Sequence, residues 1–402
     1  MASNHIERFR GASRNLQLQP LLSDEDRAKF WVEYGGECLD QLEQKVLDCT
    51  ESTNQFVFAG HTGCGKSTLL KKFSQKLDEE YFTVFFSIAD LIQANEINHI
   101  NILFAIALQM MEKATEQNIA IAEEKKQAFF NWFKERTETI TTGNSGDIGF
   151  GLDLFGIIKG NLKTSHSTKE EIKTKFTKNF RDLTETLNAI ATEIKLATKR
   201  EIVVIIDDLD KADLNKVDEI FKENLKALLQ PRFIVIYTIP IATIRDGVLK
   251  KYIEDETGNR IFVMPVLKLY PKGESRKPDG KPHDRTLKIL QALLTRRIDA
   301  DLFEAGIEEK IEDVKIDQAI LTETLNNLRN DMTITLSKSD REILLETYSN
   351  YRPDDPKQQE FLDLLHNLVA IEYRNSESWY DVHPLIVEQL RIEELILVES
   401  AQ

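Results

Sequence analysis

Hydrophobic residues along the chain form short continuous runs, separated by longer segments in which they recur every three or four positions. The runs at 56–59, 81–88, 202–206 and 232–239 are rich in β-branched and aromatic residues, which predicts buried strands. A further run over 261–269 predicts the last strand of the same sheet. Because the segments between these runs have helical periodicity, the pattern predicts an α/β domain built on a central parallel sheet.

Helices are predicted before and between these strands. Acidic residues directly after Ser23 favour a helix start, since carboxylates are stabilised in a first helical turn. The apolar positions over 100–116 have the spacing of one helix face. Ser167 and Glu170 have the spacing of a capping box, which predicts the start of a long amphipathic helix that ends near Ile194.

The composition changes in the segment 139–166, which holds six glycines among β-branched residues. We interpret it as a glycine-rich hairpin or an insertion outside the central sheet. Its glycines are not followed by a Gly-Lys-Ser sequence, so a second phosphate-binding loop is excluded there.

The distribution of these patterns predicts four parts. An N-terminal helical segment covers 1–50, and the sheet domain covers 51–270. A linker rich in proline and lysine begins at 271 and leads into a helical lid that extends to 350. The order helix, β-hairpin, helix over 351–402 is typical of a small winged-helix domain, a class that includes DNA-binding modules and protein-binding modules.

The turn between the first predicted strand and its helix carries the most specific chemistry. Residues 60–67 fit the pattern G-x-x-x-x-G-K-[ST]. Its glycines let successive backbone N–H groups face one point, and the helix N-terminus favours an anion there. Lys66 is predicted to bind the β- and γ-phosphates of ATP or ADP, and Ser67 is predicted to bind Mg²⁺. The predicted nucleotide-binding residues are Gly60, His61, Thr62, Gly63, Cys64, Gly65, Lys66, Ser67 and Thr68.

Polar residues at the ends of two later strands are the next candidates. The strand 202–206 ends in Asp207 and Asp208, and the following strand ends at Thr238. In P-loop proteins the first acid at this position holds Mg²⁺, so Asp207 takes that role, and Asp208 is positioned to polarise the attacking water. Thr238 is predicted to contact the γ-phosphate or its water. The alternatives are a solvated acidic turn and a plain turn at the strand end.

Composition and charge limit the function classes. The chain has 402 residues and a formal charge of −15, which argues against a surface that binds nucleic acid throughout. A locally basic stretch over 268–297 leaves a nucleic-acid contact open, beside a solvated hinge. Three isolated cysteines favour a reducing compartment, and the polar N-terminus and short apolar runs predict a soluble cytoplasmic protein without membrane contact.

Together, the motifs at 60–68, 202–210 and 238–240, with the helical lid and winged module, resemble the STAND and AAA+ branch of P-loop ATPases. Origin-recognition-type ATPases and nucleotide-binding immune receptors share that plan. The resemblance covers residues 25–398. It implies adenine rather than guanine nucleotides, since no N-K-x-D signature is present.

The resemblance also assigns roles to single residues. His383 occupies the place of the histidine in the receptors' Met-His-Asp motif, which contacts the β-phosphate of ADP, although Pro384 replaces the acid. Alternatively, His383 caps the last helix. Arg260 stands where AAA+ proteins carry an arginine that reaches a neighbouring subunit's γ-phosphate, with a surface arginine as the alternative. Asp208 replaces the glutamate of most AAA+ members, which suits slow hydrolysis.

The resemblance implies an ATP-binding switch that hydrolyses ATP slowly and signals by changing conformation and assembling with a partner, in the setting of bacterial defence. The partner is expected to be a separate sensor or effector protein, and nucleotide-dependent homo-oligomers are a further expectation. The alternative is an AAA+ DNA-associated remodeller or loader that uses the stretch 268–297 or the winged module on nucleic acid. A third reading is a nucleotide-bound scaffold without turnover.

Overall fold

The computed structural model divides the chain into two compact units. The sheet unit comprises 37–60 and 69–264, and the terminal unit comprises 1–36, 61–68 and 265–402. The described residues are 2–17, 19–49, 54–137, 152–277, 279–298, 318–375 and 377–392.

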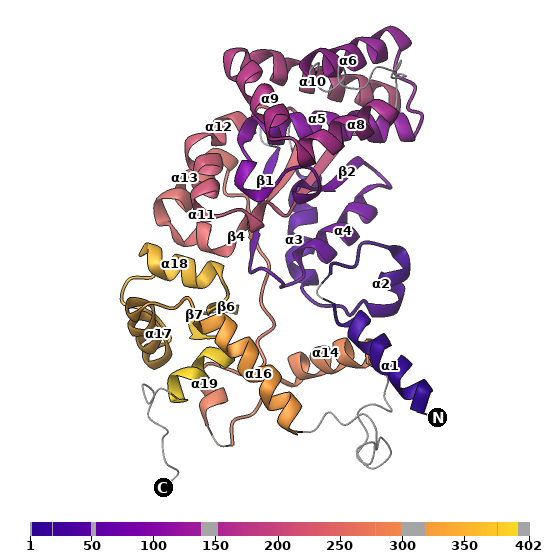
Figure 1. Ribbon diagram of the computed structural model, residues 1–402. Coiled ribbons are helices and arrows are strands. Elements are labelled where there is room, and N and C mark those ends of the chain that lie inside the picture. The colour runs from indigo at the N-terminus through magenta and orange to yellow at the C-terminus, as the bar shows by residue number, and fades with distance from the viewer. Residues whose placement is uncertain are drawn as a thin grey trace. The chain divides into compact units, whose positions relative to one another are not determined.

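Five parallel strands form the core of the sheet unit, in the order β2-β3-β4-β1-β5. Every residue of β1, β3 and β4 is buried. Because successive side chains of a strand point to opposite faces, helices must cover both faces of the sheet. The three-layer α/β prediction is therefore confirmed (Figure 1). The strands are β1 Gln55–Gly60, β2 Phe82–Ser87, β3 Ile202–Asp207, β4 Ile234–Pro240 and β5 Ile261–Val263.

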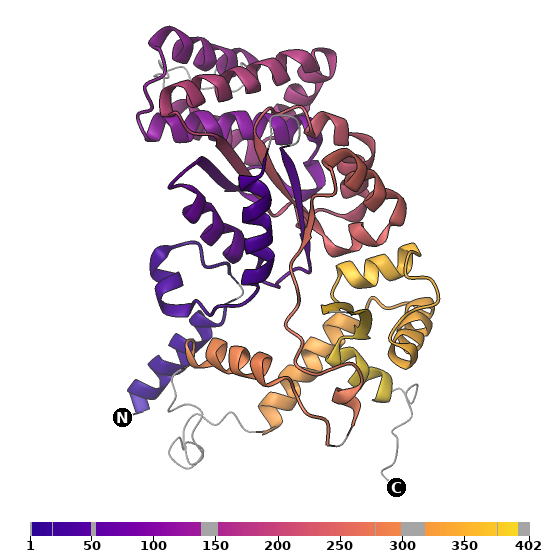
Figure 2. The ribbon, with the colours of Figure 1, turned by 180° about the vertical axis from the view of Figure 1, so that it is seen from behind.

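Helix α5 is the central helix on one side of the sheet unit and is buried along most of its length. Helix α5 packs against β2 and is in contact with α8, α9, α10 and α12. Both ribbon views show α6, α8, α9 and α10 clustered beside it (Figures 1 and 2). The helices are α3 Gly36–Leu47, α4 Lys66–Leu77, α5 His99–Glu116, α6 Glu123–Arg136, α8 Leu152–Thr164, α9 His166–Lys178, α10 Phe180–Thr198, α11 Leu214–Asp218, α12 Leu225–Leu228 and α13 Gly247–Thr257.

The glycine-rich segment 139–166 differs from its prediction. Residues 139–151 lie outside the described residues, whereas the following residues form helix α8 and not a hairpin. Leu154, Ile158 and Leu162 recur every fourth position and are buried, so they give this helix an apolar face despite its two glycines. The hairpin interpretation is wrong for this part of the segment because packing outweighs the low helix propensity of glycine.

The long helix predicted over 167–194 is two helices, α9 and α10, which are separated by Asn179 in a non-helical conformation with φ of −142° and ψ of 62°. Helix α9 begins two residues earlier than predicted, because its N-cap is Ser165, whose side chain accepts a hydrogen bond from the backbone N–H of Thr168. The predicted capping box of Ser167 and Glu170 is therefore wrong.

The terminal unit is built from helices and one antiparallel hairpin, β6–β7. Phe361, Leu365 and Ile386 are fully buried and form part of its core. The predicted order of helix, hairpin and helix is present, while assignment to the winged-helix class stays a prediction. The elements are α1 Ala2–Asn15, α2 Asp24–Phe30, α14 Asp284–Thr295, α16 Gln318–Thr333, α17 Lys338–Asn350, α18 Gln359–His366, β6 Ala370–Asn375, β7 Glu377–Val382 and α19 Pro384–Ile392.

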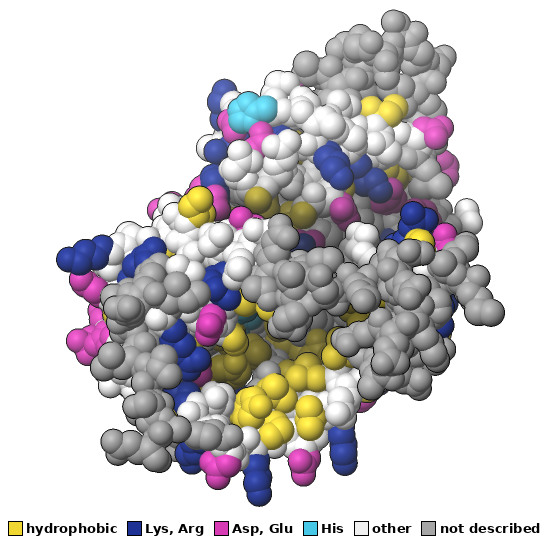
Figure 3. Space-filling view, turned by 60° about the horizontal axis from the view of Figure 1, so that its bottom comes forward, with side chains coloured by type: hydrophobic (Ala, Val, Ile, Leu, Met, Phe, Trp, Pro, Cys, Tyr) yellow, Lys and Arg dark blue, Asp and Glu magenta, His cyan; other side chains and the backbone are white. Residues whose placement is uncertain are grey.

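Some apolar surface of the terminal unit is open to solvent. Helix α14 has apolar residues at helical spacing, yet none of its residues is buried. Leu294 in α14 and Leu328 in α16 are exposed. Figure 3 shows hydrophobic side chains gathered on the face that looks down in Figure 1. Among the described residues, no helix has the length and apolar character needed to cross a membrane.

Candidate functional site

The predicted phosphate loop has the expected strand–turn–helix context. Strand β1 ends at Gly60 and helix α4 begins at Lys66. Gly63 and Gly65 have φ angles of 76° and 93°, which residues with a Cβ rarely adopt, so glycine is required at these two positions. The loop therefore ends at a helix N-terminus, where free backbone N–H groups favour an anion.

Lys66 supplies the positive charge of this loop. Its side chain is buried, and its Nζ donates a hydrogen bond of 2.7 Å to the backbone carbonyl of His61. An ammonium group is costly to bury without partners, so the loop holds a cation in place for negatively charged ligand oxygens. This arrangement fits the predicted role of Lys66 toward the β- and γ-phosphates.

The N-terminal segment of the terminal unit holds the outer side of the loop. The backbone N–H of Leu21 donates to Thr68 Oγ1 at 3.0 Å, and Tyr34 Oη donates to the carbonyl of Cys64 at 2.6 Å. A Cβ on Gly65 would lie 1.8 Å from Tyr34 Oη, so the phenol lies directly against the loop backbone. Burial raises the pKa of Tyr34 to about 12, which keeps the phenol protonated as a donor. No motif in the sequence indicates these contacts.

The C-terminal hairpin contacts the same loop. The backbone N–H of Glu372 in β6 donates to His61 Nε2 at 3.0 Å. Both residues are buried, with exposed fractions of 4% for His61 and 2% for Glu372. Sequence reasoning assigned His61 to the loop but gave its imidazole no partner.

The acidic residues lie in a tight turn at the end of β3 in the sheet unit. One carboxylate oxygen from each of Asp207, Asp208 and Asp210 lies within 4.8 Å of the others. Asp207 and Asp210 are each 3% exposed. Carboxylate oxygens are the donors that Mg²⁺ prefers, so these residues fit the predicted metal role of Asp207.

Asp208 is held by two neighbours. Ser87, at the end of β2, donates to Asp208 Oδ2 at 2.7 Å, and Lys211 Nζ forms an ion pair of 2.7 Å with Oδ1. Burial opposes the charge of Lys211, but the hydrogen bond and charge of Asp208 outweigh it and raise the pKa of this lysine. Both carboxylate oxygens thus have a partner in the protein. Ser87 and Lys211 were missed, although a serine at a strand end is a visible signal.

Thr238 fixes the acidic turn. Its side chain is fully buried at the end of β4. Its Oγ1 donates to the carbonyl of Ile206 and accepts from the backbone N–H of Leu209, both at 3.1 Å. These are the contacts of a residue that positions the turn, and the proposed contact with the γ-phosphate stays a prediction.

Within the sheet unit, β1, β4 and β3 end at the same edge of the sheet. Strands β1, β4 and β3 are parallel neighbours, so their carboxyl ends point the same way. Gly60 is in register with Pro240, and β3 ends at Asp207. The chain therefore enters the phosphate loop from the same edge that carries the acidic turn, which is where open α/β sheets bind ligands.

Arg260 lies at the other end of the strands from the acidic turn. It precedes β5, which is parallel to β1, so it lies at the amino ends of the strands. Its guanidinium lies 4.8 Å from the ring centroid of Phe56, and Nη1 donates to Cys49 Sγ at 3.3 Å. A role in a neighbouring subunit stays a prediction.

His383 has the contacts of a helix cap. Its Nδ1 accepts from the backbone N–H of Leu385 at 3.3 Å, and its carbonyl accepts from Ile386 and Val387 at the start of α19. Burial lowers the pKa of His383, which favours the neutral ring. The contact with a β-phosphate stays a prediction.

Several cations of the basic stretch 268–297 pack against aromatic rings of the terminal unit. Lys268 lies 4.7 Å from the ring centroid of Trp379. Arg276 lies 3.9 Å from that of Tyr351 and also forms an ion pair of 2.7 Å with Asp381. The rings are far from these cations in sequence, so the sequence pattern could not indicate the contacts between them. A nucleic-acid contact stays a prediction.

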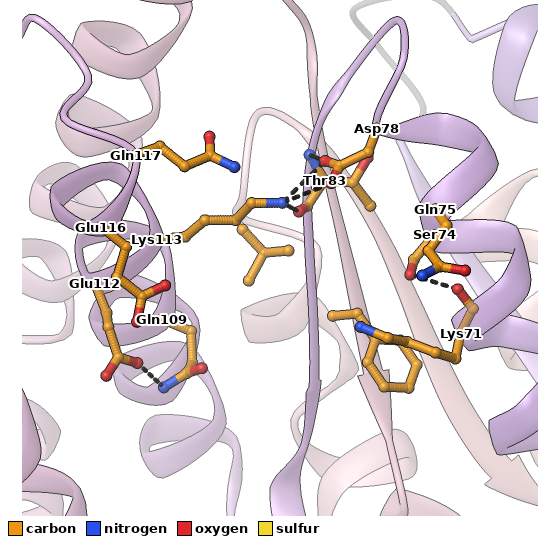
Figure 4. Close-up of a pocket in the computed structure, with 12 residues that line it drawn as sticks. Lys71, Ser74, Gln75, Asp78, Thr83, Gln109, Glu112, Lys113, Glu116 and Gln117 are labelled. Atoms are coloured by element: carbon orange, nitrogen blue, oxygen red, sulfur yellow. Dashed lines mark hydrogen bonds and ion pairs between the residues drawn. The ribbon is translucent and has the colours of Figure 1, made fainter. Parts of the chain in front are cut away.

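A polar hollow of about 250 Å³ lies apart from these residues, between α4, β2 and α5 (Figure 4). Lys113 lies across it, pairing with Asp78 at 2.9 Å and donating to the carbonyl of Thr83. Asp78 Oδ1 in turn accepts from the backbone N–H of Thr83 at 3.3 Å. Lys113 and Asp78, two of the charged residues that line the hollow, are thus bound to the backbone of the border strand β2.

Comparison with known proteins agrees with the class of this site. The family model described as KAP family P-loop domain matches residues 38–261. Among solved structures, the chain is similar to the ORC2 protein of Aeropyrum pernix in ADPNP–ADP complexes, with 11% identity over 90% of this chain and 94% of that chain and a TM-score of 0.34. A likeness this distant indicates nothing about function, and no curated protein sequence matches the chain. Because the family match spans more than half of the chain, including the phosphate loop and the acidic turn, the chain belongs to the KAP family of P-loop NTPase domains.

Proposed function

We propose that the protein binds ATP with Mg²⁺ and hydrolyses it slowly, as a switch that changes conformation and assembles with a separate partner. The observation that carries the proposal is the phosphate loop with its buried cation. Lys66 is held inside a turn that ends at a helix N-terminus, and the acidic turn follows at the same edge of the sheet. Lys66 would bind the β- and γ-phosphates, and Ser67 and Asp207 would hold the metal.

Two observations support a slow switch rather than a fast enzyme. Both oxygens of Asp208 already bind Ser87 and Lys211, so its carboxylate must be shared or released before it can polarise water. The phosphate loop also contacts both the N-terminal segment and the C-terminal hairpin of the terminal unit. Binding of phosphate in the loop would therefore affect contacts with segments that are far apart in sequence. A conformational switch requires such a link between its ligand and other parts of the fold.

Replacing Lys66 tests the site. Lys66→Ala removes a charge-assisted hydrogen bond of about 1.5–3 kcal/mol, so ATP affinity should fall by about 10- to 150-fold. Lys76→Ala in the same helix is the matched control, because Lys76 pairs with Glu43 on the surface. Calorimetric titration measures the affinity, and circular dichroism checks the fold. Wild-type ATP affinity in a folded Lys66→Ala variant would contradict the proposal.

The finer parts of the proposal need their own measurements. ADP that remains bound through purification, with little basal turnover, would support the switch. ATP turnover that rises on addition of DNA would favour a DNA-associated remodeller instead. The setting in bacterial defence and the separate sensor or effector protein rest on the resemblance to STAND proteins, and capture of a defined partner in one nucleotide state alone would support them.

A further inference from the structure

The imidazole of His61 connects the phosphate loop to the β6–β7 hairpin through one buried hydrogen bond. His61 is the second residue of the loop motif, and its Nε2 accepts from the backbone N–H of Glu372. Only a ring with a lone pair on Nε2 can accept this bond. Because both partners are buried, breaking the bond would leave this donor and this acceptor out of reach of water. Breaking the bond therefore costs free energy.

The same residue also contacts the cation of the loop. The carbonyl of His61 accepts from Lys66 Nζ at 2.7 Å, while its ring reaches the hairpin. One residue thus touches the group that would hold the phosphates and the element that lies more than three hundred positions further along the chain. A shift of the loop backbone at His61 moves both contacts together.

The hairpin end of this bond is braced. The buried carboxylate of Glu372 accepts hydrogen bonds from Arg374 Nε and, at 3.0 Å, from Ser378 Oγ. Trp379 in β7 stacks on Tyr373 in β6, with ring centroids 4.5 Å apart. These contacts fix Glu372 within the hairpin. A displacement of its backbone N–H would therefore move the whole hairpin.

We propose that the β6–β7 hairpin regulates nucleotide exchange by holding the phosphate loop through His61. With the hairpin docked, the loop is held closed on the phosphates and the nucleotide leaves slowly. When the hairpin moves, as on binding a partner, the hydrogen bond is lost and exchange becomes faster. This inference rests on the proposed function, because it assigns regulation to the same nucleotide site.

The experiment measures the release of a fluorescent ADP analogue from the full-length protein by stopped flow. His61→Leu introduces an apolar side chain of similar size and removes the acceptor, and release should become about 2- to 12-fold faster, as expected for the loss of one buried hydrogen bond. His61→Gln places an amide oxygen near the position of Nε2 and should restore slow release. Rescue by glutamine separates the hydrogen bond from a mere need for bulk.

A variant on the hairpin side makes the test independent of the loop sequence. Arg374→Met leaves the buried carboxylate of Glu372 without its guanidinium partner and should also speed release. If both changes act through one contact, the double variant His61→Leu/Arg374→Met should release the analogue no faster than the faster single variant. Hydrogen exchange at the Glu372 amide should rise in each single variant.

The possible failures are distinct. If the wild-type protein does not bind the analogue, the proposed function itself fails. If it binds, but release from the His61→Leu and Arg374→Met variants matches the wild type, the regulatory role of the hairpin is overturned while nucleotide binding stands. Additive effects in the double variant would likewise overturn the shared contact.

Discussion

Asp208 has a left-handed backbone conformation, with φ of 66°. For an aspartate this costs on the order of 1 kcal/mol, which its bonds to Ser87 and Lys211 can offset. The side chain is thereby held in one orientation beside Asp207, and the two neighbouring acids have different surroundings. Because Asp207 and Asp208 have different surroundings, they can have different roles, and substituting each residue alone can distinguish these roles.

Asp208→Asn keeps the shape of the side chain but removes its charge. ATP affinity should remain, while turnover should fall by about 10²- to 10⁴-fold, the usual contribution of a general base. Asp207→Asn should weaken Mg²⁺-dependent ATP binding as well. Single-turnover rates and Mg²⁺ titrations measure both effects, and identical defects in the two variants would contradict separate roles.

His383 gives a prediction for the dependence of stability on pH. Burial lowers its pKa in the folded protein below the ordinary value of 6.5, so the unfolded chain takes up the proton first as the pH falls. The stability linked to His383 is therefore full above pH 6.5 and is lost as the pH falls through the folded pKa. His383→Asn keeps a capping side chain and should make the melting temperature less sensitive to acid below pH 6.5. An equal dependence of the melting temperature on pH in the variant and the wild type would contradict this prediction. The rate of ADP release from the variant tests separately whether His383 contacts the β-phosphate.

At the scale of elements, Thr238 joins the end of β4 to the turn after β3. Thr238→Val keeps the shape and removes both hydrogen bonds, which should destabilise the fold by about 1–3 kcal/mol because a buried N–H and C=O lose their partner. Turnover should fall while affinity for ATP and ADP is retained. Thr238→Ser, which keeps the hydroxyl, is the control. A selective loss of ATP affinity relative to ADP would instead support a contact with the γ-phosphate.

The sequence reveals those elements whose determinants are local. The phosphate loop follows from its glycines and lysine, and the acidic turn follows from a β-branched run that ends in carboxylates. Helix α8 was missed because its glycines outweighed its four-residue apolar spacing. The contact between His61 and Glu372 could not be predicted, because residues 311 positions apart meet through the tertiary fold alone and a backbone donor leaves no mark on the sequence.

At the scale of the whole molecule, Arg260 tests assembly. If it reaches a neighbouring subunit's nucleotide, ATP turnover per subunit should rise with protein concentration, and Arg260→Ala should abolish that rise. Such an arginine contributes about 10³- to 10⁵-fold in related phosphoryl transfer. Arg260 also packs on Phe56, so the melting temperature of the Arg260→Ala variant must be compared with that of the wild type. Arg200→Ala, which removes an arginine elsewhere on the surface, is the control. Concentration-independent turnover would show that Arg260 serves the fold of its own chain.

The hollow beside β2 has a consequence for how the protein behaves among other chains. Strand β2 ends the described sheet, and the backbone of Thr83 faces away from β3. Asp78 and Lys113 occupy its N–H and C=O with charged side chains. A strand from another molecule would have to displace this pair and bury both charges in order to add to the sheet. The β2 border of the described sheet is thereby protected at Thr83 against the addition of a foreign strand, and β5 at the other border offers a pairing strand of only 3 residues.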